Sequence, residues 1–244
     1  MKTRFRFTKI GSMKFIGHLD VMRFFQKAIR RAKLDVAYSK GYSPHQLMSF
    51  ASPLGVGLTS DGEYLDVEFN SLPENMDKNE LIAYLNQSMT DEIFVTDFEI
   101  LPDKFKTSMA LLSACDYVLS FKDGYEIPGD FVKKFDDYMN REHIMIWKKT
   151  KRSEKEVDVK PHILQYAFTR EDFEQKIGQN LPEFHGEVYE NGVTLYLQLT
   201  SGSAVNIKPD LIMNDFLTFA GMTPNPYSYQ IHRLNMYFDG GNHE

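Results

Sequence analysis

The sequence predicts an α+β protein built from two ferredoxin-like (split βαβ) domains in tandem, with residues 1–102 in the first and residues 115–244 in the second. The chain opens with alternating charged and aromatic residues, typical of a half-buried strand, and then changes to the period of an amphipathic helix. The order strand, helix, strand, strand, helix, strand is complete within the first hundred residues and begins again after residue 114. With 244 residues, 42% of them hydrophobic, the chain is long enough for two domains with separate cores.

A strand over residues 2–10 and a helix over residues 18–33 have the clearest patterns in the first domain. In the strand, Arg4 and Arg6 alternate with two phenylalanines, which predicts a buried aromatic face and a basic outer face. The helix turns its apolar residues to one side and its basic residues to the other, and the basic side carries Arg23, Lys27, Arg30 and Arg31.

The remaining elements keep the same order. The first domain is expected to continue with a helix at 78–89 and with strands at 36–39, 63–69 and 93–101. The second domain is expected to contain helices at 130–140 and 210–219, and strands at 117–121, 143–149, 157–168, 193–199 and 231–238.

The charges are strongly segregated along the chain, although the net charge is only −6. Residues 1–50 contain eleven Lys and Arg against two acidic residues, a local balance of +9, whereas residues 51–100 contain one lysine against eleven acids, a balance of −10. A polyanion responds to the local field and not to the sum, so the first block favours an anionic partner. The alternative is that neighbouring strands pair the two blocks and their charges partly cancel.

Several classes of protein are excluded by what the sequence lacks. No run approaches the ~18–20 consecutive apolar residues of a membrane span, and the start lacks the apolar region of a signal peptide, so we expect a cytoplasmic protein without membrane contact. The single cysteine, Cys115, excludes an internal disulfide and an iron–sulfur cluster held by this chain alone. Nucleotide-binding glycine loops, zinc-helix motifs and the serine-hydrolase elbow are absent, and we expect no metal site.

His18 and Asp20 stand where the first helix is expected to begin. A histidine there has an unperturbed pKa of about 6.5 and is a candidate general acid or base. The alternative is structural: His18 helps to cap the helix, and Asp20 complements the positive end of the helix dipole.

The loop at 41–45 places an aromatic, a hydroxyl and an imidazole directly after Lys40. Tyr42 is a candidate platform for stacking on a base, with Lys40 beside it for phosphate, although a proline-containing turn with a packed tyrosine is the alternative. Residues 148–160 predict a basic hairpin or loop whose Lys149 and Lys160 are further candidate phosphate ligands, or merely solvated side chains.

The chain resembles the radical-SAM-linked family of uncharacterised bacterial proteins, which are encoded beside a radical S-adenosylmethionine (SAM) protein or fused behind one. The resemblance is dense over residues 3–70 and is carried by Arg4-Phe5-Arg6-Phe7-Thr8-Lys9, Met13-Lys14-Phe15-Ile16-Gly17-His18-Leu19-Asp20-Val21-Met22-Arg23, Val36-Ala37-Tyr38-Ser39-Lys40-Gly41-Tyr42-Ser43-Pro44-His45, Ser49-Phe50-Ala51-Ser52-Pro53-Leu54 and Glu63-Tyr64-Leu65-Asp66. The positions that match the family pattern are His18, Asp20, Arg23, Tyr42, Pro44, Ser49, Phe50 and Glu63.

The resemblance implies a radical SAM protein as a partner. It also suggests that the two proteins act on RNA or on a ribosomal component. It implies that the iron–sulfur cluster and SAM belong to the partner and that this chain binds no cofactor of its own. We therefore expect an accessory or binding protein more than an enzyme, with RNA or phosphate held by Arg4, Arg6, Arg23, Lys27, Arg30, Lys40, Tyr42, Lys149 and Lys160. Two alternatives are a metal-independent RNA-processing or RNA-modifying enzyme that uses His18 with Tyr42 or a nearby lysine, and a protein–protein adaptor without RNA. The candidate catalytic residues of such an enzyme are His18, Asp20 and Tyr42.

Overall fold

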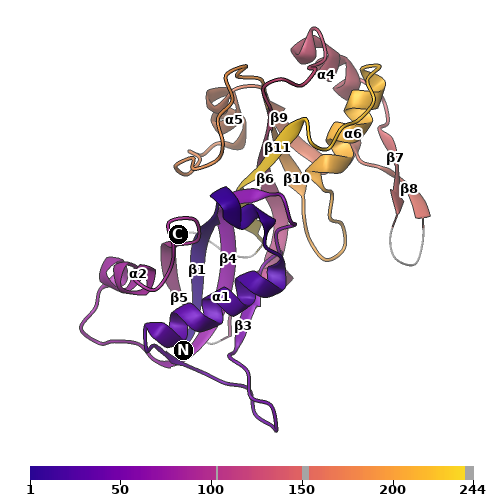
Figure 1. Cartoon of the computed structure of the whole chain (residues 1–244). Coiled ribbons are helices and arrows are strands. Elements are labelled where there is room, and N and C mark those ends of the chain that lie inside the picture. Colours follow the sequence, from indigo (N-terminus) through magenta and orange to yellow (C-terminus); the bar gives the residue numbers. More distant parts are fainter. Residues whose placement is uncertain (103, 150–153, 240–244) are drawn as a thin grey trace. The chain divides into compact units, whose positions relative to one another are not determined.

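The computed structural model describes residues 1–102, 104–149 and 154–239 and is α+β (Figure 1). The chain forms two compact units. Unit 1 contains Met1–Ser113, Pro182–Gly186 and the chain from Arg233 onward, and unit 2 contains Ala114–Leu181 and Glu187–His232. The first boundary between the units, after Ser113, falls between the two domains that the sequence predicts. The two later segments of unit 1 were not predicted, because they follow more than sixty residues of unit 2.

The sheet of unit 1 is antiparallel and has β4 at its centre. Its neighbours follow the order β5-β1-β4, and β2 and β3 pair with β4 on the side away from β1, as does the part of β11 that belongs to this unit. The strands are β1 (Lys2–Lys9), β2 (Asp35–Val36), β3 (Met48–Phe50), β4 (Thr59–Ser71), β5 (Val95–Leu101) and β11 (Tyr229–Phe238).

Helices cover one face of this sheet, and the core of unit 1 lies between them. These helices are η1 (Gly11–Phe15), α1 (His18–Arg31) and α2 (Lys78–Asn86), and α1 crosses the strands in Figure 1. The short α3 (Ser108–Leu111) lies at the other face, where Ser108 binds Asp66 of β4. The rings of Phe7 in β1 and Phe25 in α1 meet edge to face at 4.7 Å, and both side chains are buried. Because this contact fixes which side of α1 faces inward, it also fixes which side faces solvent.

In unit 2 the strands follow the order β11-β6-β10-β9, and β7 and β8 form a separate hairpin. Its strands are β6 (Leu112–Phe121, of which Ala114 onward belongs to this unit), β7 (Met145–Lys149), β8 (Glu154–Asp158), β9 (Ile163–Ala167) and β10 (Thr194–Thr200). Its helices are α4 (Phe131–Met139), η2 (Lys160–His162), α5 (Arg170–Ile177) and α6 (Pro209–Phe219). The thiol of Cys115 in β6 is fully buried.

Three local predictions differ from the structure. Residues 157–168 were expected to be one strand, but η2 interrupts them, because Pro161 fixes its φ and lacks the N–H that a strand would use. Helix α5 was not expected, since Phe173 is its only buried residue and it has no apolar stripe to recognise. The strand expected at 36–39 is shorter, because β2 ends at Val36.

Gly62 permits a close approach of β4 to β11 within unit 1. A methyl group on Gly62 would lie 2.5 Å from the carbonyl oxygen of Leu234 and 2.6 Å from the Cα of Asn235, distances that real side chains do not adopt. The part of β11 that belongs to unit 1 can therefore lie this close to β4 because position 62 has no side chain. In the part of the chain that the structure describes, no helix has both the length and the apolar character needed to cross a membrane.

Candidate nucleic-acid interface

The predicted basic outer face of β1 is wrong at Arg4. The side chain of Arg4 is only 4% exposed, and its Nε donates to Oδ1 of Asp66 at 2.8 Å. Its guanidinium carbon lies 5.0 Å from the ring centre of Phe105 and 4.7 Å from that of Phe238, so two aromatic side chains from later segments cover it. Arg4 is thus a buried, paired cation and has no surface to offer a phosphate.

Arg6 also turns into the fold. Its guanidinium donates to the carbonyl oxygen of Leu234 at 3.2 Å and lies 5.9 Å from the ring centre of Tyr64. Burial is the main cause that raises the pKa of Tyr64, and the positive charge of Arg6 opposes that rise. Arg6 therefore joins the strands of unit 1 and does not form part of an open basic surface.

The cationic side of α1 is exposed as predicted. Arg23, Lys27 and Arg30 point to solvent because the opposite side of the helix, which includes Val21 and Phe25, is buried in the core. Arg23 approaches Oδ1 of Asp20 at 3.2 Å, an exposed pair one helical turn apart that contributes little to stability. Lys27 and Arg30 make no side-chain hydrogen bond or ion pair with the residues that the structure describes.

Arg31 differs from its neighbours on the helix. Its guanidinium donates a hydrogen bond to the carbonyl oxygen of Ser88, in the segment that follows α2. Arg31 therefore belongs to the internal contacts of unit 1, and it is not part of the exposed group.

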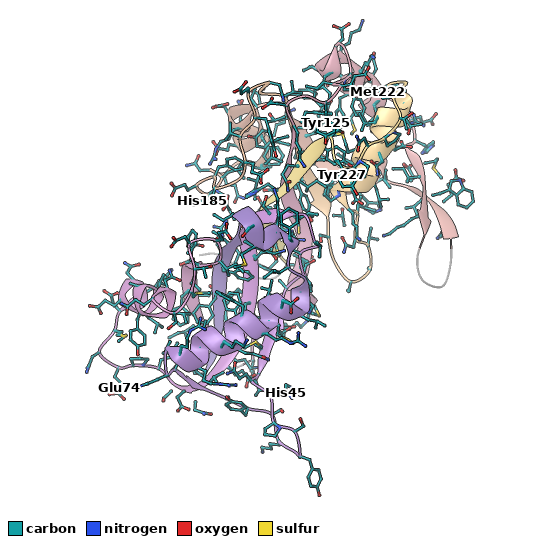
Figure 2. The ribbon with its side chains drawn as sticks, in the orientation of Figure 1. His45, Glu74, Tyr125, His185, Met222 and Tyr227 are labelled. Atoms are coloured by element: carbon teal, nitrogen blue, oxygen red, sulfur yellow. The ribbon has the colours of Figure 1, made fainter. Side chains whose placement is uncertain are left out.

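The loop after β2 carries a second exposed group. Tyr42 is fully exposed at its tip, and Lys40 is also exposed. The base of the loop is held, because the Ser39 N–H donates to the carbonyl oxygen of His45 at 2.8 Å. Figure 2 shows the loop with His45 extending away from the body of unit 1. Tyr42 does not pack within its own turn, so the stacking interpretation keeps an available ring.

The base of the loop lies next to α1. The side-chain amide of Gln46 donates to the carbonyl oxygen of Gln26 at 3.3 Å, and Gln26 directly precedes Lys27. We use the term basic surface for Arg23, Lys27 and Arg30 of α1 together with Lys40 and Tyr42 of this loop. The structure anchors both parts to one another at the loop base.

Several carboxylates of the acidic block have partners in unit 1 other than the basic surface. Glu63 binds Arg233 at 2.8 Å, Asp66 binds Arg4, and Asp97 forms an ion pair with Lys78. Three further carboxylates accept hydrogen bonds. Glu92 accepts from Ser12, and Asp77 accepts from a backbone N–H in the first turn of α2. Asp61 accepts from the backbone N–H of His185. The predicted cancellation therefore applies to Arg4 on the sheet and not to the helix.

His18 faces a small internal cavity and does not cap α1. The cap residue is Gly17, without a side-chain hydrogen bond, and the ring of His18 meets that of Phe50 edge to face at 5.3 Å. The cavity, which Lys9 and Glu63 also line, is about 10 Å³, the space of about one water molecule. This arrangement places His18 near two charged groups but leaves no room for a nucleotide.

Lys9 is an unusual member of this cavity because its side chain is 1% exposed. Its ammonium donates to the carbonyl oxygens of Ile16 at 3.1 Å and Lys14 at 3.5 Å. Burial lowers the pKa of Lys9 below its usual range, and the negative charge of Glu63 opposes the shift.

Two of the predicted phosphate ligands, Lys149 and Lys160, belong to unit 2. Lys160 donates a hydrogen bond to the carbonyl oxygen of Arg141 and so supports the turn at η2. The side chain of Lys149 lies outside the described residues, although its backbone ends β7.

A buried aspartate and a histidine form a pair that the sequence did not indicate. Oδ1 of Asp61 lies 3.0 Å from Nδ1 of His185, and its Oδ2 accepts the backbone N–H of His185 at 2.9 Å. Because 124 positions separate the two residues, no local pattern announced the pair. Among the described residues, no group of three or more His, Cys, Asp or Glu side chains forms a metal site.

A comparison with known families gives one match. Residues 2–209 match a family described as uncharacterized proteins conserved in bacteria (DUF2344). The chain belongs to this family. No curated protein matches the chain significantly. The matched region includes α1, the Tyr42 loop and all of β4, and it ends at Pro209, the first residue of α6. The family description names no radical SAM protein, so that link stays a prediction.

The lowered pKa of Lys9 predicts a pH effect on stability. The folded protein binds fewer protons at Lys9 than the unfolded chain does between the lowered pKa and 10.5, so deprotonation favours folding in this window. We expect the unfolding free energy of the wild type, measured against that of Lys9→Met, to rise as the pH increases from about 8 to about 10.

Urea unfolding followed by circular dichroism at three pH values measures this difference, with Lys133→Met, at an exposed position of α4, as the control. A difference between wild type and Lys9→Met that stays constant, or falls with pH, contradicts the expectation.

Proposed function

We propose that this chain is an RNA-binding accessory protein of a radical SAM enzyme and that the basic surface holds the RNA. The observation that carries the proposal is that Lys27 and Arg30 are exposed on α1 without a carboxylate partner among the described residues, while several carboxylates of the acidic block in the same unit bind other residues. Exposed cations in one row, next to an exposed aromatic ring, are the elements with which proteins hold a single strand.

The spacing on α1 suits a phosphate backbone. Arg23 and Arg30, with Lys27 between them, are seven positions apart, or about 10 Å along the helix axis, which is the rise of roughly three nucleotides of one strand. Such contacts position the nucleic acid without reading its sequence. Tyr42 adds a face on which an unpaired base stacks, and stacking tolerates any base.

The assignment to RNA and to a radical SAM partner rests on the resemblance in the first seventy residues. In this proposal the partner carries the iron–sulfur cluster and SAM, while the present chain presents the RNA or a ribosomal component. The single cysteine supports this division, because it is buried in β6 and a cluster normally takes three or four thiolates.

The geometry gives less support to the two alternatives. An RNA-processing enzyme that uses His18 needs space for a nucleotide beside the imidazole, and the cavity there is about 10 Å³. An adaptor without RNA would use the same exposed cations for an acidic protein surface, and the stacking position of Tyr42 favours nucleic acid over that partner.

We also propose that both units follow the ferredoxin-like plan. In unit 1 the order β5-β1-β4, with β2 and β3 beyond β4, supports this plan, and in unit 2 the order β11-β6-β10-β9 supports it in the same way. In unit 1 the neighbours β1 and β4 are followed by α1 and α2, and in unit 2 the neighbours β6 and β10 are followed by α4 and α6.

Neutralising Lys27 and Arg30 should weaken the salt dependence of RNA binding. For a single-stranded RNA, log affinity falls linearly with log salt with a slope of about −0.7 for each phosphate contact, so the double change Lys27→Gln/Arg30→Gln should reduce the slope by about 1.4. Fluorescence anisotropy with a labelled oligonucleotide between low and moderate salt measures the slope.

The control is Lys133→Gln, at an exposed position on α4 of unit 2, and the slope should stay that of the wild type. A wild-type affinity that does not change with salt rules out the proposed phosphate contacts.

Removing the ring of Tyr42 should weaken binding without changing the salt slope. Stacking contributes about 1–3 kcal/mol for each base, so Tyr42→Ala should lower the affinity by roughly five- to hundredfold, while Tyr42→Phe keeps it. The same anisotropy titration measures both variants, and Tyr227→Ala, which removes an exposed tyrosine of unit 2, serves as the control. Equal affinities for Tyr42→Ala and the wild type would exclude stacking at this position.

The proposed partnership has its own test. The tagged chain, purified from cells that encode the radical SAM partner, should retain that protein as a specific band identified by mass spectrometry. Retention after nuclease treatment indicates direct protein contact, and loss indicates that RNA joins the two. Absence of the partner before nuclease treatment contradicts the partnership.

A further inference from the structure

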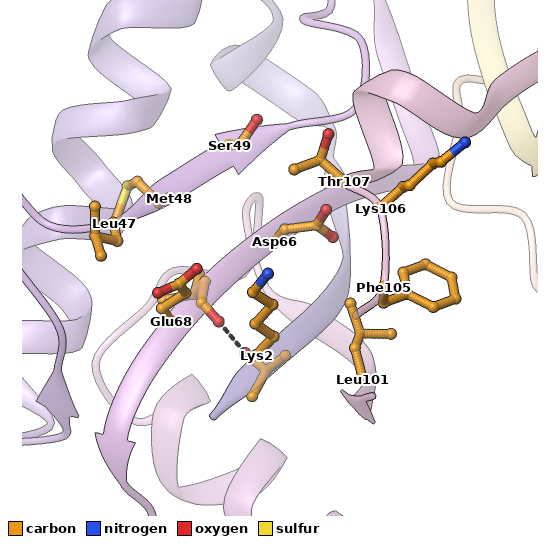
Figure 3. A pocket seen from close by; sticks show the side chains of 12 residues that line it. Lys2, Leu47, Met48, Ser49, Asp66, Glu68, Leu101, Phe105, Lys106 and Thr107 are labelled. Atoms are coloured by element: carbon orange, nitrogen blue, oxygen red, sulfur yellow. Dashed lines mark hydrogen bonds between the residues drawn. The ribbon is translucent and has the colours of Figure 1, made fainter. Parts of the chain in front are cut away.

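A cavity of about 220 Å³ lies on the face of the unit 1 sheet away from α1, and the basic surface does not include it (Figure 3). It is smaller than the roughly 300–1,000 Å³ of sites for drug-sized ligands. A single ring system with part of a sugar fits this size, whereas a dinucleotide does not.

The walls of the cavity are apolar on two sides. Leu47 stands on one side and Leu101 and Phe105 on the other, as Figure 3 shows. All three belong to unit 1, and Phe105 comes from the segment that also covers Arg4. Apolar side chains on two sides favour a flat ligand whose ring faces contact carbon atoms.

Asp66 lies at the cavity but is already saturated. Its Oδ1 binds Arg4 at 2.8 Å, and its Oδ2 accepts the backbone N–H of Ser108 at 2.6 Å and the hydroxyl of Ser108 at 2.9 Å. Asp66 therefore fixes the position of the wall and is not the group that selects the ligand.

Five other polar side chains remain available. Lys2 and Glu68 are directly opposite each other in the β1–β4 register, yet they form no ion pair within the described part of the chain. The hydroxyls of Ser49 and Thr107 and the ammonium of Lys106 also line the cavity and make no side-chain hydrogen bond to any described residue. The cavity thus offers two ammoniums, one carboxylate and two hydroxyls to a ligand.

We infer that this cavity binds one unstacked nucleobase. A base is neutral and flat, and its edge carries both hydrogen-bond donors and acceptors, which Glu68 and Lys2 complement. The inference rests on the proposed function for RNA as the source of the base. Geometry supports a path, because β3 follows the Tyr42 loop in the chain and itself provides Met48 and Ser49 to the cavity.

Titration with free nucleosides tests the cavity apart from the phosphate contacts. Adenosine, cytidine, guanosine and uridine have no phosphate, so their binding does not depend on the basic surface. We expect saturable shifts of the backbone amides of Ser49, Leu101 and Thr107 in nuclear magnetic resonance spectra, with a Kd below about 1 mM for at least one nucleoside.

Two variants report on the cavity itself. Ser49→Phe fills it with a ring on a strand position that accommodates aromatic residues, and it should weaken nucleoside binding more than tenfold. Glu68→Gln keeps the shape and removes the charge, and it should weaken binding by about tenfold. Val132→Phe, which adds a ring at an exposed position of α4, should bind like the wild type.

The outcomes separate this inference from the proposed function. If no nucleoside gives a saturable shift, if L-phenylalanine binds as well as the nucleosides, or if both variants bind like the wild type, the cavity is not a base site. Should Ser49→Phe fail to fold by circular dichroism, Glu68→Gln decides alone. Nucleoside binding without salt-dependent RNA binding would support the base site in the cavity and contradict the proposed phosphate contacts of the basic surface. Salt-dependent RNA binding without nucleoside binding would support the phosphate contacts and contradict the base site.

Discussion

The carboxylates of β4 determine which cationic side chains of unit 1 are buried and which are exposed to solvent. Asp61, Glu63 and Asp66 lie on one thirteen-residue strand, and each holds a positive or polar partner from a different part of the chain. Buried charges need partners, because an unpaired ion in a protein interior loses its hydration without compensation. Since these three acids serve His185, Arg233 and Arg4, they cannot also reach the cations on the far side of α1.

This division explains how a chain with a net charge of −6 presents a cationic face. Acidic residues are more numerous than basic ones, but several of them bind partners within the sheet or at the ends of helices and strands. Glu92, for example, accepts a hydrogen bond from Ser12. The basic residues of α1 are displaced from the sheet by one layer of buried side chains, which include Phe25 and Ile29. A partner that approaches the helix therefore meets positive charge, whatever the sum over the chain.

The sequence was sufficient where the structure depends on local spacing. The helix at α1 and its exposed Lys27 and Arg30 follow from a 3.6-residue period, and the strand character of β1 and β4 follows from alternation. The exposed ring of Tyr42 also agrees with its place in a loop rich in turn residues.

The sequence was not sufficient where distant segments meet. Arg4 looked like a surface residue because the rings that cover it, Phe105 and Phe238, come from about 100 and 230 positions later. The pair of Asp61 and His185 and the cavity beside Ser49 have the same origin, and no periodicity encodes them. Helix α5 was missed for another reason, since a helix with one buried residue carries almost no apolar signal.

The solitary thiol of Cys115 has a practical consequence. It is enclosed in β6, where maleimides and similar electrophiles cannot reach it while the fold is intact. A fluorophore or cross-linker can therefore be attached at any newly introduced surface cysteine without first removing the natural one. The same shielded sulfur becomes reactive when β6 opens, so the rate of its alkylation reports local unfolding of that strand.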